Sequence, residues 1–207
     1  QRIQKKFPCF EFASEGTPRL QRQIEQLTSS WDQIGDIRRN YKVEIEANMF
    51  RFVFPEHPLN MVSRWSVGSD KDSIIKRAAF NGMGLVIWQD VFGAWLPFNK
   101  KQKQLIKKLK NLLTKFHDII YGSNSVPLIE TLSNGLICNQ FCNDNNQKIF
   151  AIYNFTNKNI KGPIFTLESK TKIKLQQIFG VNTNLKIKKI QKINALFGSI
   201  PANEVIL

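Results

Sequence analysis

The apolar residues of the first 125 positions alternate between strand-like and helix-like runs. Short apolar runs that end in glycine, proline or acidic residues predict strands at 8–14, 49–54 and 84–90. Apolar residues that recur every three or four positions predict helices at 19–34, 69–82 and 99–122. Strands that alternate with helices in this way are typical of parallel βα units.

The pattern changes after about residue 125, where the apolar residues follow a period of roughly two. This period predicts strands at 128–133, 136–142, 148–155, 162–169, 172–180, 186–197 and 204–207. Turn residues separate the runs, and Asn134-Gly135 is a typical hairpin signal. Short strands of this kind predict an all-β antiparallel sandwich. The sequence therefore predicts two domains, residues 1–125 and 126–207.

The three strand-like runs of the first part each end in polar or ionisable residues. Glu15 follows the first run, Glu56-His57 the second, and Gln89-Asp90 the third. A (β/α) barrel carries its reacting groups at the carboxyl ends of its parallel strands. The predicted fold is a partial (β/α) barrel, its last three βα units, followed by the sandwich. A whole barrel needs about 250 residues, so we expect a fragment, whose full-length chain would supply the missing N-terminal half of the barrel.

Two motifs carry a family resemblance. GLVIWQDVFGAW (84–95) resembles the last barrel strand of bacterial TIM-barrel glycoside hydrolase-like proteins that carry W-E-N-x-x-G-x-W there, with Gln89 and Asp90 where that pattern has Glu and Asn. NQKIFAIYNFTNKNIKGPIF (146–165) resembles a strand and turn of the β-sandwich domain that follows such barrels. The resemblance implies a hydrolase, a glycosidase of carbohydrate metabolism.

Glycosidic cleavage generally uses two carboxylates, about 5–5.5 Å or 6.5–9.5 Å apart. Glu15 and Asp90 are the predicted catalytic pair, and the alternative for each is an acid in a turn or at a helix entry. The predicted substrate-binding residues are Glu56, His57, Arg64, Trp88, Gln89 and Trp95. The tryptophans would offer flat faces to sugar rings, and the alternative for both is a place in the core.

The net charge and the cysteines indicate which classes of partner and cofactor the chain is expected to bind. The formal net charge is +14, and residues 100–207 hold 17 lysines, no arginine and five acids. Phosphate recognition favours the arginine fork, so the lysines indicate solvated faces and do not favour nucleic acid. Cys138 and Cys142 lack a second pair of ligands, and we predict no metal and no cofactor.

No run reaches the ~18 apolar residues of a membrane span, so we predict a carbohydrate substrate and no membrane partner. The compartment stays open between secreted and cytoplasmic. The sequon Asn154-Phe155-Thr156 is a weak sign of secretion.

Three alternatives to a glycosidase fragment remain. The chain could be a carbohydrate-binding or structural module without catalysis, or a nucleic-acid-binding protein that uses its lysine-rich β region. It could also be a complete α+β protein of 207 residues. As a fragment it is predicted to be inactive by itself.

Overall fold

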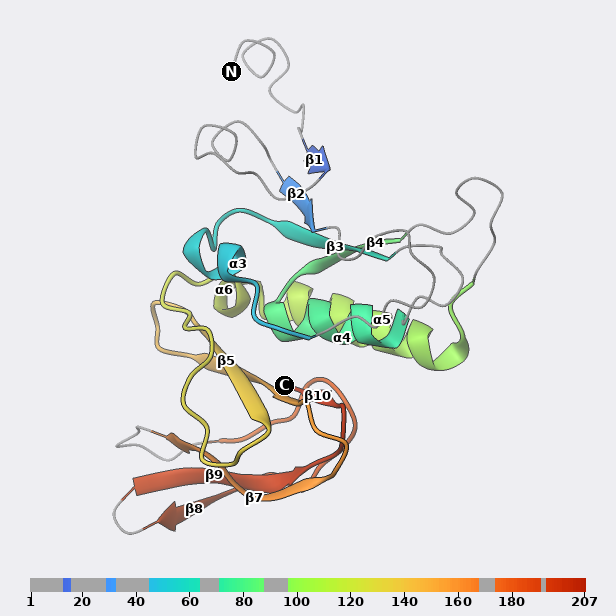
Figure 1. The fold of residues 1–207 in the computed structure, drawn as a ribbon. Helices are drawn as coiled ribbons and strands as arrows, with labels where there is room; N and C mark the ends of the chain where they lie inside the picture. Colours follow the sequence, from blue (N-terminus) through green and yellow to red (C-terminus); the bar gives the residue numbers. More distant parts are fainter. Residues whose placement is uncertain are drawn as a thin grey trace.

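The computed structural model describes residues 13–15, 29–32, 45–63, 71–87, 97–167, 174–190 and 193–207. Its elements form successive layers (Figure 1): a parallel sheet, a layer of helices, and two antiparallel sheets.

The first sheet contains four parallel strands in sequential order. They are β1 (Ala13–Glu15), β2 (Ser29–Asp32), β3 (Leu59–Ser63) and β4 (Gly84–Ile87). The pairing is staggered, because the last residue of β1 is level with the second residue of β3 and the first of β4.

The predicted partial (β/α) barrel is wrong. The described residues form one open sheet of four strands and two sheets of three, with about 25% helix, 35% strand and no closure. A barrel closes only when its first and last strands pair, with a consistent tilt and stagger. Among the described residues β1 pairs only with β2, and β4 pairs only with β3.

Two secondary-structure predictions in the first part are also wrong. The run 49–54 is not a strand, because Met49–Val53 form helix α3, in which the rings of Phe50 and Phe54 lie 5.0 Å apart. Aromatic residues two apart suit a strand, but residues four apart also meet on a helix. Residues 29–32 of the predicted helix 19–34 form β2, because strand pairing on both sides overrides the helical spacing.

The helix layer contains α4 (Lys71–Asn81), α5 (Lys100–Lys115) and the short α6 (His117–Ile120). Gly82, with φ of 61°, ends α4 in the left-handed conformation that glycine adopts easily. A reciprocal capping box between Asn99 and Gln102 begins α5. The predicted helix 99–122 is thus two helices, which divide at Phe116.

The second half is β-rich. The sheet β10-β6-β5 joins Val205–Ile206, Lys148–Asn154 and Leu136–Cys142, and the sheet β7-β9-β8 joins Ile160–Leu167, Ile193–Ile200 and Lys186–Ile190. The predicted strand 186–197 is a hairpin of two strands, β8 and β9. Residues 128–133 and 174–180 form no strand, which corrects the predictions there.

The sheet β10-β6-β5 is buried on both faces. One face shares an apolar cluster with β7 and β9 that contains Leu136, Cys138, Ile152, Ile164, Phe165, Leu196, Ile200 and Ile206. The other face packs on the helices, where Phe141 stacks on Phe52 with ring centroids 5.6 Å apart. A single core therefore extends across residue 125. The division into domains 1–125 and 126–207 stays a prediction.

Candidate functional site

Five of the predicted site residues, Arg64, Trp88, Gln89, Asp90 and Trp95, lie outside the described residues. Glu15 is placed by its backbone at the end of β1, and Glu56 and His57 lie between α3 and β3. The described part of the chain thus tests where three predicted residues sit relative to the parallel sheet.

The register places Glu15 in a row across all four strands. Glu15 pairs with Trp31, Trp31 with Asn60, and Asn60 with Gly84. The neighbours of Asn60 along β3, Leu59 and Met61, are fully buried in the core shared with α4. Since successive strand residues point to opposite faces, Asn60 lies on the face turned away from the helices. Trp31, its partner in the register, shares that face.

Asn60 and Gly84 fit each other closely. A Cβ atom at position 84 would collide with the side-chain oxygen of Asn60, so glycine provides the space into which the amide leans. The Asn60 side chain is half-buried, and among the described residues it has no hydrogen-bond partner. An amide that is partly withdrawn from water and still holds donors and acceptors is suited to bind a polar ligand.

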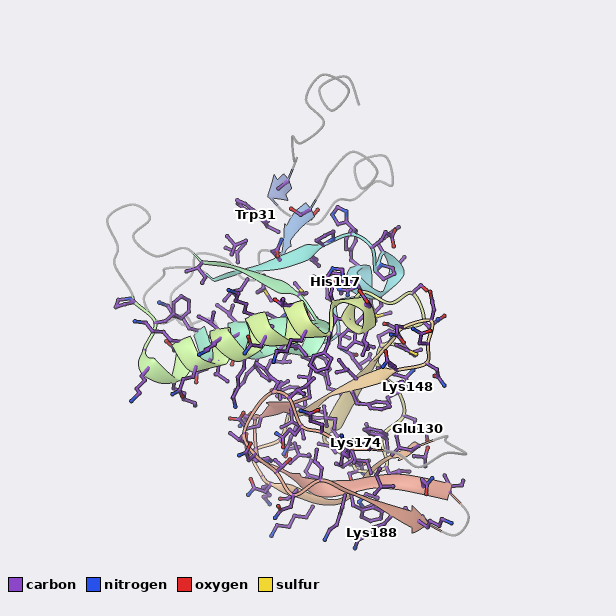
Figure 2. The ribbon with its side chains drawn as sticks, turned by 180° about the vertical axis from the view of Figure 1, so that it is seen from behind. Trp31, His117, Glu130, Lys148, Lys174 and Lys188 are labelled. Atoms are coloured by element: carbon purple, nitrogen blue, oxygen red, sulfur yellow. The ribbon has the colours of Figure 1, made fainter. Side chains whose placement is uncertain are left out.

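Sequence reasoning missed both Trp31 and Asn60. Trp31 lies in the predicted helix 19–34, and Figure 2 shows it on β2, at the end of the molecule far from the sheet β7-β9-β8. The sequence patterns above predict no element for Leu59–Ser63, although its order of apolar, polar and apolar residues is a short strand signal. The row Glu15, Trp31, Asn60 and Gly84 will be called the sheet row.

The predicted site residues lie at different levels of the sheet. Glu15 is level with Gly84, which precedes Asp90 by six residues. β1 and β4 are three strand spacings apart, about 14 Å, which exceeds the distance between paired catalytic carboxylates in either type of glycosidase. The catalytic pairing of Glu15 with Asp90 therefore stays a prediction. Asp32, at the end of β2, is one residue beyond the sheet row.

Glu56 and His57 do not follow a strand, so this part of the prediction is wrong. They precede the amino end of β3, because 49–53 is helical. His57 is buried, and its Nε2 is hydrogen-bonded to Oγ of the fully buried Ser30 at 2.8 Å. Burial lowers the pKa of His57 below its ordinary value, and the charge of Glu56 opposes this shift. The Ser30–His57 pair joins β2 to the start of β3, and substrate binding by Glu56 and His57 stays a prediction.

The two described cysteines and the asparagine of the sequon are buried in the fold. Cys138 and Cys142 are buried free thiols, and burial raises the pKa of Cys138. Within the described ranges, no three His, Cys, Asp or Glu side chains are grouped as metal ligands would be. Asn154 is fully buried, and its amide donates hydrogen bonds to the carbonyl oxygens of Lys158 and Ile200. The folded chain therefore does not present this sequon for glycosylation.

Among the helices of the described residues, none has both the length and the apolar character needed to cross a membrane. Comparison with known proteins gave no relative: no family model matches the chain, and no curated protein matches it.

Proposed function

We propose that this chain binds carbohydrate, with the sheet row as its sugar-binding surface. The single observation that carries this proposal is the half-buried Asn60 amide, which leans over Gly84 and has no hydrogen-bond partner among the described residues. Trp31 occupies the neighbouring strand at the same level, and Glu15 follows on the next strand.

The composition of the sheet row suits a sugar ring. A pyranose has an apolar C–H face, which an indole ring can cover, and hydroxyl groups around its rim, which need both donors and acceptors. A carboxamide supplies two donors and an oxygen acceptor, and a carboxylate supplies acceptors. A ligand that is apolar throughout would leave the Asn60 amide unsatisfied, at a cost of about 1–3 kcal/mol.

Glycoside hydrolysis is a second candidate, because a carboxylate, Glu15, belongs to the sheet row. Such a reaction needs a second carboxylate about 5–9.5 Å away. The substitution E15Q keeps the shape of the side chain and removes its charge. If Glu15 acts in catalysis, E15Q lowers the turnover of glycosides at least 100-fold and leaves sugar affinity within a few-fold. The exposed Glu130 offers the matched control E130Q, for which no change is expected.

Binding is tested by titrating the 207-residue chain with neutral oligosaccharides of glucose, galactose, xylose and mannose, followed by calorimetry and tryptophan fluorescence. We expect saturable binding of at least one series. N60A and W31A each weaken it about tenfold, which corresponds to one lost hydrogen bond or stacking contact of about 1.4 kcal/mol. N145A, which alters an exposed asparagine in the turn between β5 and β6, serves as the control.

G84A tests the position of the Asn60 amide most directly, because it removes no polar group. The added methyl group displaces the Asn60 amide, so we expect an affinity loss close to that of N60A with the fold retained. Absence of binding to all four sugar series, or equal affinities of wild type, W31A and G84A, would refute the proposal.

A further inference from the structure

The helix α5 has a strongly basic exposed face. Lys100–Lys115 contain seven lysines, all exposed, and no acidic residue. Two of them are engaged: Lys101 pairs with Asp72 at 3.2 Å, and the Lys108 Nζ donates to the Gly180 carbonyl oxygen at 2.9 Å. The other five, Lys100, Lys103, Lys107, Lys110 and Lys115, have no ion-pair or hydrogen-bond partner in the described part of the chain.

Four of the unpaired lysines follow one line along the helix. Lys100, Lys103, Lys107 and Lys110 are spaced by three, four and three residues, so they share one face and extend over about 15 Å. These four residues will be called the lysine stripe. The apolar side of the helix is buried at Leu109 and Leu112, and in Figure 2 α5 lies in front of α4. The stripe therefore faces solvent as a row of positive charge, and no described residue neutralises it.

These positive charges destabilise helix α5. Lysines three or four residues apart repel each other, and the first turn has three lysines and no acid, which opposes the helix dipole. The capping box at Asn99 and the buried leucines offset these effects. An anionic partner laid along α5 would relieve both kinds of repulsion.

We infer that the lysine stripe is a docking surface for an anionic polysaccharide, a sugar polymer that carries carboxylate or sulfate groups. The inference rests on the proposed function for the choice of a sugar polymer. Single-stranded nucleic acid is disfavoured, because α5 contains no aromatic residue on which bases could stack. A membrane surface is disfavoured, because such helices insert an apolar side, whereas Leu109 and Leu112 of α5 are buried in the core and Leu105 and Leu113 are partly buried against it.

The test compares two variants of equal net charge. The first replaces the lysine stripe (K100Q, K103Q, K107Q, K110Q), and the second replaces four other exposed lysines (K158Q, K161Q, K186Q, K189Q). Glutamine has nearly the helix propensity of lysine, and far-UV circular dichroism checks that α5 is kept. The probes are heparin, polygalacturonate, neutral dextran, a single-stranded DNA of 20 nucleotides and vesicles containing phosphatidylserine.

We expect binding of heparin or polygalacturonate that weakens as sodium chloride rises from 50 to 200 mM, because exposed charges are screened. The stripe variant loses at least tenfold in affinity and shows a shallower salt dependence, and the control variant loses threefold or less. Equal losses in the two variants, or no binding of either polysaccharide, would overturn the inference, as would tighter binding of DNA or vesicles than of both polysaccharides.

The same titrations separate this inference from the proposed function. The stripe variant should keep the affinity of the chain for neutral oligosaccharides, which N60A and G84A weaken. If the chain binds no neutral sugar but the stripe variant still loses polysaccharide affinity, only the role of the sheet row is refuted. If neutral sugars bind as proposed but the stripe variant binds polysaccharides as tightly as the wild type does, only the role of the lysine stripe is refuted.

Discussion

The parallel sheet and the antiparallel sheet β7-β9-β8 use polar residues in opposite ways. Near the parallel sheet, Ser30, Arg51 and His57 are buried and bonded to other elements, and Asn60 is half-buried. In the sheet β7-β9-β8 the exposed polar residues are mostly lysines. Polar groups inside a fold cost free energy unless they are paired, and the Asn60 amide is the group near the parallel sheet that is half-buried without a hydrogen-bond partner among the described residues.

The edge strand β8 gives the lysines of the second region a structural explanation. β8 (Lys186–Ile190) pairs on one side only among the described strands, and its lysines are exposed (Figure 2 labels Lys188). Lysines on an edge strand prevent other chains from adding to the sheet. The five lysines of α5 that lack a partner among the described residues lie on a helix and have no such role.

The largest loss of unfolding free energy is expected for the substitution F141A, which tests whether the two regions unfold together. Phe141 is fully buried in β5 and packs against Phe52 of α3, and such a truncation costs about 3–5 kcal/mol of unfolding free energy. All four tryptophans, Trp31, Trp65, Trp88 and Trp95, precede residue 96. Urea unfolding followed by tryptophan fluorescence should therefore shift with F141A if one core joins the two regions. An unchanged fluorescence transition would show that the regions unfold independently.

The second largest effect is expected for R51M. The Arg51 Nη2 donates to the Ile120 carbonyl oxygen at 2.6 Å, and the guanidinium lies 4.5 Å from the centre of the Tyr121 ring. Methionine keeps much of the apolar volume but leaves the carbonyl group unpaired, which costs about 1–3 kcal/mol. Chemical denaturation measures this loss. A matched exposed change, K115M, should alter stability by less than about 0.5 kcal/mol.

A comparable or smaller loss is expected for N139A, which probes the junction between the regions. Asn139 is fully buried in β5, donates to the Phe80 carbonyl oxygen at 3.1 Å, and accepts from the Leu128 backbone N–H at 3.1 Å. Alanine leaves both groups without this partner and should cost about 1–3 kcal/mol. Hydrogen exchange should show the Leu128 amide less protected, and equal protection in wild type and variant would contradict the expected role.

The smallest effect is a pH dependence from His57. Its folded pKa is lowered by burial, so as the pH falls below about 6.5 the unfolded chain takes up a proton first. The contribution of neutral His57 to the free energy of unfolding is thus fully present above about pH 6.5. Below that pH it is lost, by at most about 1.4 kcal/mol per pH unit. Unfolding free energies measured from pH 7.5 to 5 should fall less steeply for H57Q. The exposed His117 provides the control H117Q.

Part of the candidate site could be predicted from the sequence. Glu15 and its place at a strand end follow from a short apolar run before a glycine turn. Trp31 and Asn60 could not be recognised, because a strand of four or five residues has too few positions to distinguish its period from that of a helix. The grouping of Glu15, Trp31 and Asn60 depends on strand register, which no local pattern specifies.

The sequence by itself determined the elements with long or regular patterns. Helices α4 and α5 and strands β5, β6 and β7 fall at predicted positions, because their periodicity and end signals are local properties of the chain. Only the tertiary structure decided that 49–53 is helical, that 29–32 is a strand, and that the parallel sheet stays open. The reason is physical: short segments are marginal alone, and the pairing and packing partners that select their conformation lie far away in the sequence.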